Sequence, residues 1–195
     1  TGFGKVPSLR LDAADKPVVA WEEWDAVNNI YVKRFDSKDW LPVGDFLDTA
    51  PEPWAKTPSL ALDVAGNPVV AWTEWDADMN PTKSLLYLKR WDGSQWKFVG
   101  TSDPLNFINT NRAFDPSLQL GSEGSLFLTW QEAFTNGSFT ALKYFRENTW
   151  KVLVSDGKTT YSYAPSLALD ASGDPVVAWA AGSSATDTDL YVKRK

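Results

Sequence analysis

The chain has 195 residues and contains no histidine, no cysteine and a single methionine. Without histidine and cysteine it cannot form a Ser-His-Asp or Cys-His nucleophile system, a His-based zinc site or a c-type haem attachment site. Disulfide bonds are excluded as well, so cysteine pairing gives no information about the redox compartment. Carboxylates, arginines and tyrosines are the side chains left for acid–base chemistry or ligand binding.

Long apolar runs and positive charge are also scarce. The sequence has no run of roughly 18 or more apolar residues and no charged-then-apolar amino terminus, so we expect no membrane span and no retained signal peptide. The 19 Lys and Arg residues are outnumbered by 25 Asp and Glu residues, which gives a net charge of −6. Because nucleic-acid-binding proteins normally present a basic face, we expect no nucleic-acid partner.

Aromatic residues are abundant, with eleven Trp, ten Phe and six Tyr in a chain that is 43% hydrophobic. This composition is sufficient to bury a core, and we expect residues 1–195 to form a single domain. Cysteine-free repeats rich in aromatics, Asn, Asp, Gly and Thr are typical of exported bacterial proteins. We therefore expect a secreted or cell-surface location.

A unit of about 50 residues occurs four times, and each copy opens with Pro-Ser-Leu at Pro7, Pro58, Pro116 or Pro165. The repeats are therefore 7–57, 58–115, 116–164 and 165–195. The second copy has four strand-like segments, 59–63, 68–74, 85–91 and 96–99, joined in part by hairpin signals at Gly66 and Asp92-Gly93. The last copy stops before a fourth strand, so it lacks its outer strand.

Four-stranded units repeating at this period predict an all-β fold, a β-propeller whose blades are four-stranded antiparallel sheets. We expect a closed four-bladed ring, or alternatively part of a larger ring. Two sets of equivalent residues should lie on the innermost strands and between the blades respectively: Leu9, Leu60, Leu118 and Leu167, and Trp21, Trp72, Trp130 and Trp179. Closure of the ring could use residues 2–6 paired with residues 190–193, a flanking segment, or a second chain as a homo-oligomer.

Function is expected on the rim that carries the loops between second and third strands, at 24–29, 75–83, 133–140 and 180–189, together with the linkers between blades. We call it the loop rim. Its loops vary in length and sequence, whereas the opposite rim has short, uniform hairpins, and variable loops on a rigid scaffold carry binding. The candidate ligand-binding residues are the aromatic and cationic side chains of this rim: Trp24, Trp54, Trp75, Phe107, Arg112, Phe134 and Tyr161.

Other polar patterns favour structural roles. Glu23, Glu74 and Glu132 recur two residues after a repeated Trp, and Ala181 breaks the series in the fourth copy. A residue repeated blade after blade is more typical of a structural or multivalent binding position than of a catalytic one. Arg34, Arg90 and Arg194 recur too, and we expect them to pair with these glutamates. Asp76, Asp78 and Asn80 resemble the start of a calcium loop, but Pro81 and Tyr87 replace the required Gly and Glu. We expect no metal site and no cofactor.

The segments PSLALD, GNPVVAW and KRWDGSQW with FVG resemble the blade repeats of secreted bacterial β-propeller proteins of the sialidase-like and Kelch-like kind. The hairpin from Trp91 to Trp96 is also similar to one in six-bladed fucose-binding propeller lectins. The Arg, Glu and Trp that bind sugar in those lectins cannot be mapped onto this chain. The sialidase Asp-box is not matched either, because Trp96 lies four residues after Asp92 instead of five.

The aromatic-rich loop rim favours a carbohydrate- or surface-binding module, lectin-like and non-catalytic, with a saccharide as ligand. One alternative is a glycan-active hydrolase or lyase that uses carboxylates of the rim. Another is a structural repeat spacer in a larger exported protein. Release of sugar product would indicate the enzyme, and no response in either binding or release assays would favour the spacer.

Overall fold

A computed structural model of the chain describes residues 2–49, 54–75, 83–155, 161–184 and 186–194. These residues form fifteen β-strands and one short 3-10 turn, Ser122–Gly124. The strands are β1 (Phe3–Leu11), β2 (Pro17–Trp24), β3 (Asn28–Phe35), β4 (Trp40–Pro42), β5 (Trp54–Leu62), β6 (Pro68–Trp75), β7 (Ser84–Trp91), β8 (Trp96–Phe98), β9 (Arg112–Leu120), β10 (Leu126–Phe134), β11 (Gly137–Arg146), β12 (Thr149–Ser155), β13 (Tyr161–Leu169), β14 (Pro175–Ser184) and β15 (Asp187–Arg194).

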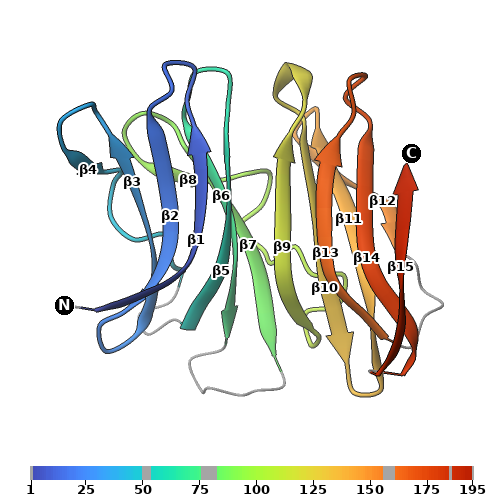
Figure 1. Ribbon diagram of the computed structural model, residues 1–195. Coiled ribbons are helices and arrows are strands. Elements are labelled where there is room, and N and C mark those ends of the chain that lie inside the picture. The colour runs from blue at the N-terminus through green and yellow to red at the C-terminus, as the bar shows by residue number, and fades with distance from the viewer. Residues whose placement is uncertain (1, 50–53, 76–82, 156–160, 185, 195) are drawn as a thin grey trace.

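The strands form four antiparallel meanders in chain order, as Figure 1 shows: β1–β4, β5–β8, β9–β12 and β13–β15. We number these blades 1 to 4. Blades 1, 2 and 3 are linked into one sheet by single parallel bridges, Asn28 to Trp54 and Ser84 to Arg112. The predicted all-β fold of stacked meanders is confirmed, and blade 4 has three strands in the described part of the chain.

A β-bulge interrupts the first strand of every blade at the repeated proline. The residue before each proline has a positive φ: 47° at Val6, 49° at Thr57, 48° at Asp115 and 47° at Ala164. The register between the first and second strands shifts at this point, and the first strand extends to both sides of the bulge. Each first strand therefore begins before the Pro-Ser-Leu text, which is why the prediction for blade 2 missed its first half, 54–58.

One of the three possible routes to ring closure, pairing of residues 2–6 with residues 190–193, is not observed among the described residues. Phe3, Gly4 and Lys5 are instead the first half of β1 and pair with the end of β2. This segment of blade 1 is equivalent to the start of the first strand in the other blades. Its Phe3 pairs with Trp24 at the end of β2. β15 pairs with β14 in the described part of the chain.

The serines of the first three Pro-Ser-Leu motifs join neighbouring blades at their first strands, which lie side by side in the order β1, β5, β9, β13. Ser8 Oγ accepts the Leu60 N–H at 3.0 Å, and Ser59 Oγ accepts the Leu118 N–H at 3.0 Å. Ser117 Oγ repeats the contact with the Leu167 N–H at 3.1 Å. These serines thereby give a hydrogen-bond partner to backbone amides at the edge of the next blade. This role explains why a serine recurs in the motif.

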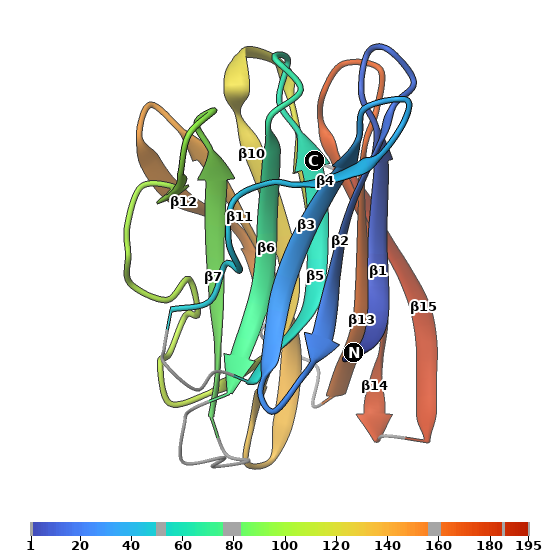
Figure 2. The same ribbon diagram turned by 90° about the vertical axis from the view of Figure 1, so that its left-hand side faces the viewer.

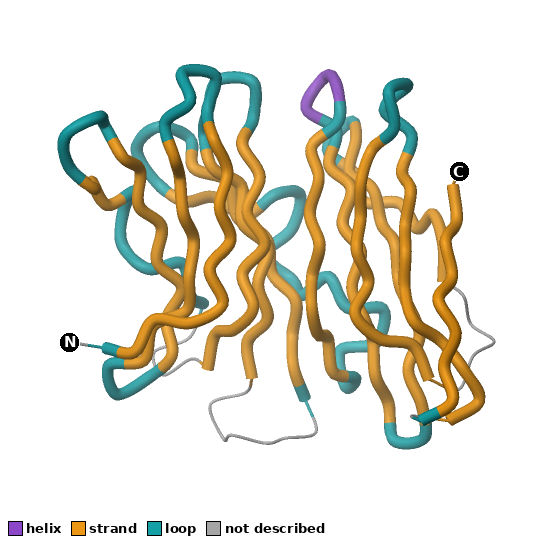
Figure 3. Tube along the Cα trace, viewed as in Figure 1, coloured by secondary structure: helices purple, strands orange, loops and turns teal. Residues whose placement is uncertain are grey.

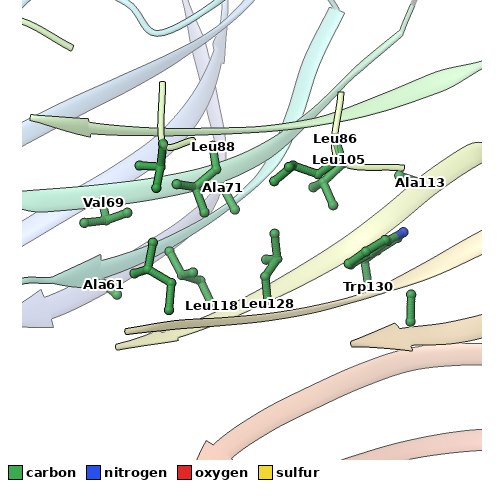
Figure 4. Close-up of a cluster of buried hydrophobic side chains, with 13 residues drawn as sticks. Ala61, Val69, Ala71, Leu86, Leu88, Leu105, Ala113, Leu118, Leu128 and Trp130 are labelled. Carbon is green, nitrogen blue, oxygen red and sulfur yellow. The ribbon is translucent and has the colours of Figure 1, made fainter. Parts of the chain in front are cut away.

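The core lies between the blades, since each blade buries one face against the next. Between blades 2 and 3 it contains Leu86, Leu88, Leu118, Leu128 and Trp130 among others (Figure 4). The repeated tryptophans Trp72 and Trp130 are fully buried, and Trp179 is 9% exposed, as predicted. The innermost-strand leucines Leu60, Leu118 and Leu167 are buried with them.

The two ends of the stack are open, and the closed four-bladed ring is not formed. Figure 1 shows β1 and β13 separated by the strands of blades 2 and 3, and Figure 2 views the stack from the blade 1 side. Leu9 on the innermost strand of blade 1 is 53% exposed, and Leu190 on β15 is 76% exposed. Trp21 is only half-buried, contrary to prediction, because no blade covers its face. No helix of the described chain is long and apolar enough to cross a membrane.

Candidate functional site

The candidate residues are spread along the loop rim, which is the lower end of the strands in Figure 3. β2, β6 and β10 end at this rim, and β5, β9 and β13 begin there. These ends place Trp24, Trp75, Phe134, Trp54, Arg112 and Tyr161, while Phe107 belongs to the linker between blades 2 and 3. The structure separates the seven residues into distinct environments, which are described in turn.

Three of them, Arg112, Phe134 and Tyr161, line one pocket of about 210 Å³. It lies between β9 and β13, the innermost strands of blades 3 and 4, and we call it the β9–β13 pocket. Its remaining lining residues are Phe114, Gln131, Ala133, Thr135, Gly137, Ser138 and Tyr163. The loops 75–83 and 156–160, which also belong to this rim, lie wholly or largely outside the described residues, as do Asp76, Asp78 and Asn80.

Four aromatic side chains, Phe114, Phe134, Tyr161 and Tyr163, line the pocket beside polar residues. The Tyr161 and Tyr163 rings are stacked, with centroids 6.4 Å apart and planes 16° apart. The Arg112 guanidinium lies 5.5 Å from the centroid of the Phe114 ring, and Phe134 is 42% exposed. The pocket therefore offers flat apolar faces next to a cation, a combination suited to an amphipathic ring-shaped ligand.

The wall shared by blades 3 and 4 is held by a hydroxyl cluster. Ser138 Oγ donates to the Ser162 carbonyl at 2.7 Å and accepts the Ser162 N–H at 2.8 Å. The Thr140 and Ser162 hydroxyl oxygens are 2.5 Å apart, and all three residues are buried. These contacts fix β13 against β11, so the aromatic residues at the start of β13 have a rigid support.

Gln131 supplies a polar group in the pocket that has no protein partner within the described chain. Only 8% of its surface is exposed, and it lines the pocket. Its counterparts in blades 1 and 2 are occupied: Glu22 accepts the Thr57 N–H at 3.0 Å, and the Thr73 hydroxyl lies 3.3 Å from that of Thr57. The Gln131 amide is reachable from the pocket and can pair there with a ligand or with water. Sequence reasoning missed Gln131, although its difference from Glu22 and Thr73 was a usable signal.

Trp54 and Trp75 form a different arrangement at the equivalent position of blade 2. They face each other across β5 and β6, and the Lys56 ammonium lies 4.1 Å from the Trp75 ring and 5.7 Å from the Trp54 ring. This cation occupies the faces on which a ligand would stack. Both tryptophans are half-buried, and their ring partner is a residue of the protein itself.

Trp24 and Phe107 differ again. Trp24 is 45% exposed and pairs with Phe3 at the open end of blade 1. This position is far from the β9–β13 pocket. Phe107 packs on Trp130 with ring centroids 5.5 Å apart, and the Lys143 ammonium lies 4.8 Å from its ring. Phe107 is thus part of the packing under the linker.

Two of the repeated glutamates, Glu74 and Glu132, anchor the interblade linkers, as the structural interpretation predicts. Glu74 accepts the Thr49 N–H at 2.9 Å, the Thr49 hydroxyl, and the Trp72 indole N–H at 2.7 Å. Glu132 accepts the amide N–H groups of Phe107 and Ile108 in the same way. Burial raises the pKa of Glu74, and these hydrogen bonds oppose that shift.

The expected pairing of arginines with these glutamates is wrong. Arg34 donates to the carbonyl of Gly66 in the hairpin of blade 2, and Arg194 pairs with Asp170 at 2.5 Å. Arg90 has buried nitrogens without a partner in the described chain. The arginines therefore face the hairpin end of the blades, whereas the glutamates lie near the loop rim. Among the described residues no cluster of three or more acidic side chains could hold a metal ion.

Comparison with family models and with curated proteins finds no match. Solved structures do match. A protein of unknown function from Dyadobacter fermentans aligns with 98% of this chain and 66% of its own, at 15% identity and a TM-score of 0.70. The alpha-L-arabinanase of Penicillium chrysogenum, complexed with arabinobiose, matches over 98% of this chain and 62% of its own, at 15% identity and a TM-score of 0.66.

A Hadza microbial sialidase covers 97% of this chain and 44% of its own, at 14% identity and a TM-score of 0.60. This chain therefore spans about two thirds or less of the length of these three proteins. At such identities the likeness concerns the fold alone, which is that of β-propeller proteins. It supports the sialidase-like part of the resemblance, while the Kelch-like and lectin-like parts stay predictions.

Proposed function

We propose that this chain is part of a glycan-processing β-propeller and that its β9–β13 pocket binds a sugar ring of the glycan. The observation that carries the proposal is the unpartnered Gln131 amide inside a pocket walled by Tyr161 and Phe134. Sugar rings have apolar faces that stack on aromatic side chains and hydroxyls that pair with amides. A volume of about 210 Å³ is below that of drug-sized sites and suits a single ring.

The non-catalytic, lectin-like interpretation is less well supported than the glycan-active alternative. The arabinanase and the sialidase among the similar structures are both enzymes by name. No carboxylate is among the residues that line the pocket in the described chain. Sugar binding therefore follows from the pocket itself, whereas cleavage requires an acid placed beside it.

Asp115 is the residue that favours cleavage as a second candidate function. It follows Phe114 of the pocket wall on β9 and stands at the bulge, with a φ of 48°. Its counterparts are Val6, Thr57 and Ala164, so the carboxyl is unique to blade 3. Asp115 is exposed at the surface, and desolvation by the surrounding protein raises its pKa, which is the direction required of a general acid. Thr57 directs its hydroxyl toward Thr73, whose counterpart in blade 3 is Gln131.

The test is isothermal titration against neutral and acidic oligosaccharides, run beside a reducing-sugar release assay. Gln131→Ala and Tyr161→Ala should each weaken binding about tenfold or more, which is the loss of roughly 1.4 kcal/mol. Thr73→Ala and Trp54→Ala, at equivalent positions of blade 2, are the matched controls and should leave affinity unchanged. If the blade 2 variants weaken binding as much as the blade 3 variants, the pocket assignment is wrong.

Release of product by the unmodified chain would establish the cleaving function, and Asp115→Asn should then abolish release while retaining binding. Asp45→Asn makes the same carboxyl-to-amide change on the exposed linker after blade 1 and should leave product release unchanged. Absence of both binding and release would favour the structural spacer. A location outside the cell remains part of the proposal, because glycan polymers are encountered there.

A further inference from the structure

We propose that the open face of blade 1 is a docking site for a further propeller blade of the same repeat type, together with the linker that leaves that blade. The face, which we call the blade 1 end face, comprises Leu9, Trp21, Glu23, Lys33 and Trp40. Each of these residues has counterparts in blades 2 and 3 that already bind the preceding blade. The argument compares the filled and unfilled positions one at a time.

The indole of the fourth-strand Trp binds the preceding linker. Trp96 Nε1 donates to the Val43 carbonyl at 2.9 Å, and Trp150 Nε1 donates to the Val99 carbonyl at 3.0 Å. Trp40 is the counterpart in blade 1. Its indole has no partner in the described chain, and the residue is 44% exposed.

A Val-Gly pair is what allows the linker to come so close. Gly44 and Gly100 have φ values of 67° and 80°, and a Cβ on either would lie 2.6 Å from an aromatic ring of the next blade. The ring belongs to Trp91 in blade 2 and to Phe145 in blade 3. Phe35 is the counterpart in blade 1, and it packs on Trp40 with centroids 5.5 Å apart. The same close-fitting surface is therefore present on blade 1.

The third-strand lysine binds a linker carbonyl. Lys89 Nζ donates to the Leu47 carbonyl at 2.5 Å, and Lys143 Nζ donates to the Leu105 carbonyl at 2.7 Å. Lys33 is the counterpart in blade 1. Its ammonium lies 5.8 Å from the Trp21 ring and binds no carbonyl in the described chain.

The second-strand glutamate binds linker amides. In addition to an indole N–H, Glu74 accepts two donors from the preceding linker and Glu132 accepts three. Glu23 keeps the indole bond, from Trp21 Nε1 at 2.8 Å, and has no linker donor among the described residues. The acceptor capacity of its carboxylate is left for an incoming segment.

The apolar part of the end face is uncovered as well. Leu60 and Leu118 are fully buried, whereas their counterpart Leu9 is 53% exposed and Leu11 beside it is 57% exposed. A cavity of about 390 Å³ opens here, lined by Gly4, Lys5, Pro7, Val19, Trp21, Lys33 and Trp40. An exposed apolar surface that repeats an internal interface indicates the partner that fits it.

A further blade that carries the linker after its fourth strand would supply a partner for each of these residues. A second copy of this chain would offer blade 4, where Val176, Ala178, Leu190 and Val192 could cover the leucines. However, blade 4 has no fourth strand or following linker in the described chain, so Trp40, Lys33 and Glu23 would stay unfilled. This chain covers 66% and 62% of two of the similar structures, and a further blade is compatible with the length of those proteins.

The first test adds a peptide of residues 38–49, KDWLPVGDFLDT, to the full chain. This segment already fills the equivalent site on blade 2. We expect the indole N–H resonances of Trp21 and Trp40 to shift, while those of Trp72 and Trp96 stay in place. Lys33→Met should reduce the shifts, and Lys16→Met on the hairpin rim is the matched control. A peptide with Gly44→Ala should bind more weakly.

The second test covers the case in which a peptide without its blade binds too weakly. A copy of residues 3–53 is placed directly before Phe3, in place of Thr1 and Gly2. Trp21 and Trp40 should then become protected from acrylamide quenching, and the melting temperature should rise by about 5 °C or more. If neither the peptide nor the added blade affects Trp21 and Trp40, the proposal is wrong. Head-to-tail association of the unmodified chain that shields both residues would also overturn it.

Discussion

Blades 2 and 3 have the same strands, bulge and interblade contacts, but their loop-rim ends differ in whether a pocket is open. In blade 2, Trp75 stands opposite Trp54 and both rings contact Lys56. In blade 3, Ala133 stands opposite Arg112, and the space that an indole would fill is part of the β9–β13 pocket. A binding site can thus arise from a large-to-small change at one position of a constant scaffold.

Shared positions and differing positions of the two blades therefore have different meanings. The repeated Ser, Glu and Trp hold the blades together, and their replacement should affect stability. Positions such as Gln131, Ala133 and Asp115 differ between the blades, and their replacement should affect ligands. The predictions below test this division.

The largest effect is expected at the shared tryptophan. Trp72 and Trp130 are fully buried, and we expect Trp72→Ala and Trp130→Ala each to lower the free energy of unfolding by about 3 to 5 kcal/mol. Trp21→Ala should cost about 1 to 2 kcal/mol, because that side chain is half-buried. Chemical denaturation of the three variants checks this, and equal losses in all three would contradict the open end of blade 1.

The linkers that precede the two blades provide the next comparison. Asn106 accepts the Leu86 N–H at 2.7 Å and donates to the Ser84 carbonyl at 3.0 Å. Asp48 is its counterpart before blade 2 and accepts the Ile30 N–H at 3.1 Å, but its second carboxyl oxygen is buried without a partner in the described chain. Burial raises the pKa of Asp48 to about 7, and the nearby Glu74 adds to the shift while Lys89 opposes it.

Since this pKa lies above the value of the unfolded chain, the contribution of Asp48 to stability is present below about pH 4 and is lost as the pH rises through 7. Asp48→Asn should raise the free energy of unfolding at pH 8 by about 2 to 4 kcal/mol, with little gain at pH 4. Asn106→Asp is the reverse change and should destabilise blade 3 at pH 8. A gain from Asp48→Asn that is the same at both pH values would exclude the protonation mechanism.

The pocket itself can be exchanged between blades. Ala133→Trp should fill the β9–β13 pocket and reduce saccharide affinity by about tenfold or more, because an indole would occupy the space of the ligand. Trp75→Ala should leave that affinity unchanged. Isothermal titration and thermal melting of both variants separate loss of binding from loss of fold, and undiminished binding by Ala133→Trp would place the ligand elsewhere.

The repeat text was sufficient to predict the blades, the burial of Trp72, Trp130 and Trp179 and the structural role of Glu74 and Glu132, because these follow from residues that recur at fixed spacing. The first half of each innermost strand was missed, since the positive φ before Pro58 and its equivalents reverses the side-chain alternation that marks a strand. The pocket was predicted only in part. Arg112, Phe134 and Tyr161 were among the candidate rim residues, and their part in ligand binding stays a prediction. Gln131 was missed, although it differs from its counterparts Glu22 and Thr73, and its lack of a partner is visible only in the structure.

The smallest effect is expected at the serines of the Pro-Ser-Leu motif, which serve blades 2 and 3 alike. Ser59→Ala removes the acceptor of the Leu118 N–H, and Ser117→Ala removes that of the Leu167 N–H. Each should cost about 0.5 to 1.5 kcal/mol, the net value of one hydrogen bond. Ser166 is the same residue on blade 4, where no further blade lies beside it in the described chain, so Ser166→Ala should cost less. Denaturation curves for the three alanine variants test this, and an equal loss at Ser166 would mean that the serine stabilises its own strand instead of joining blades.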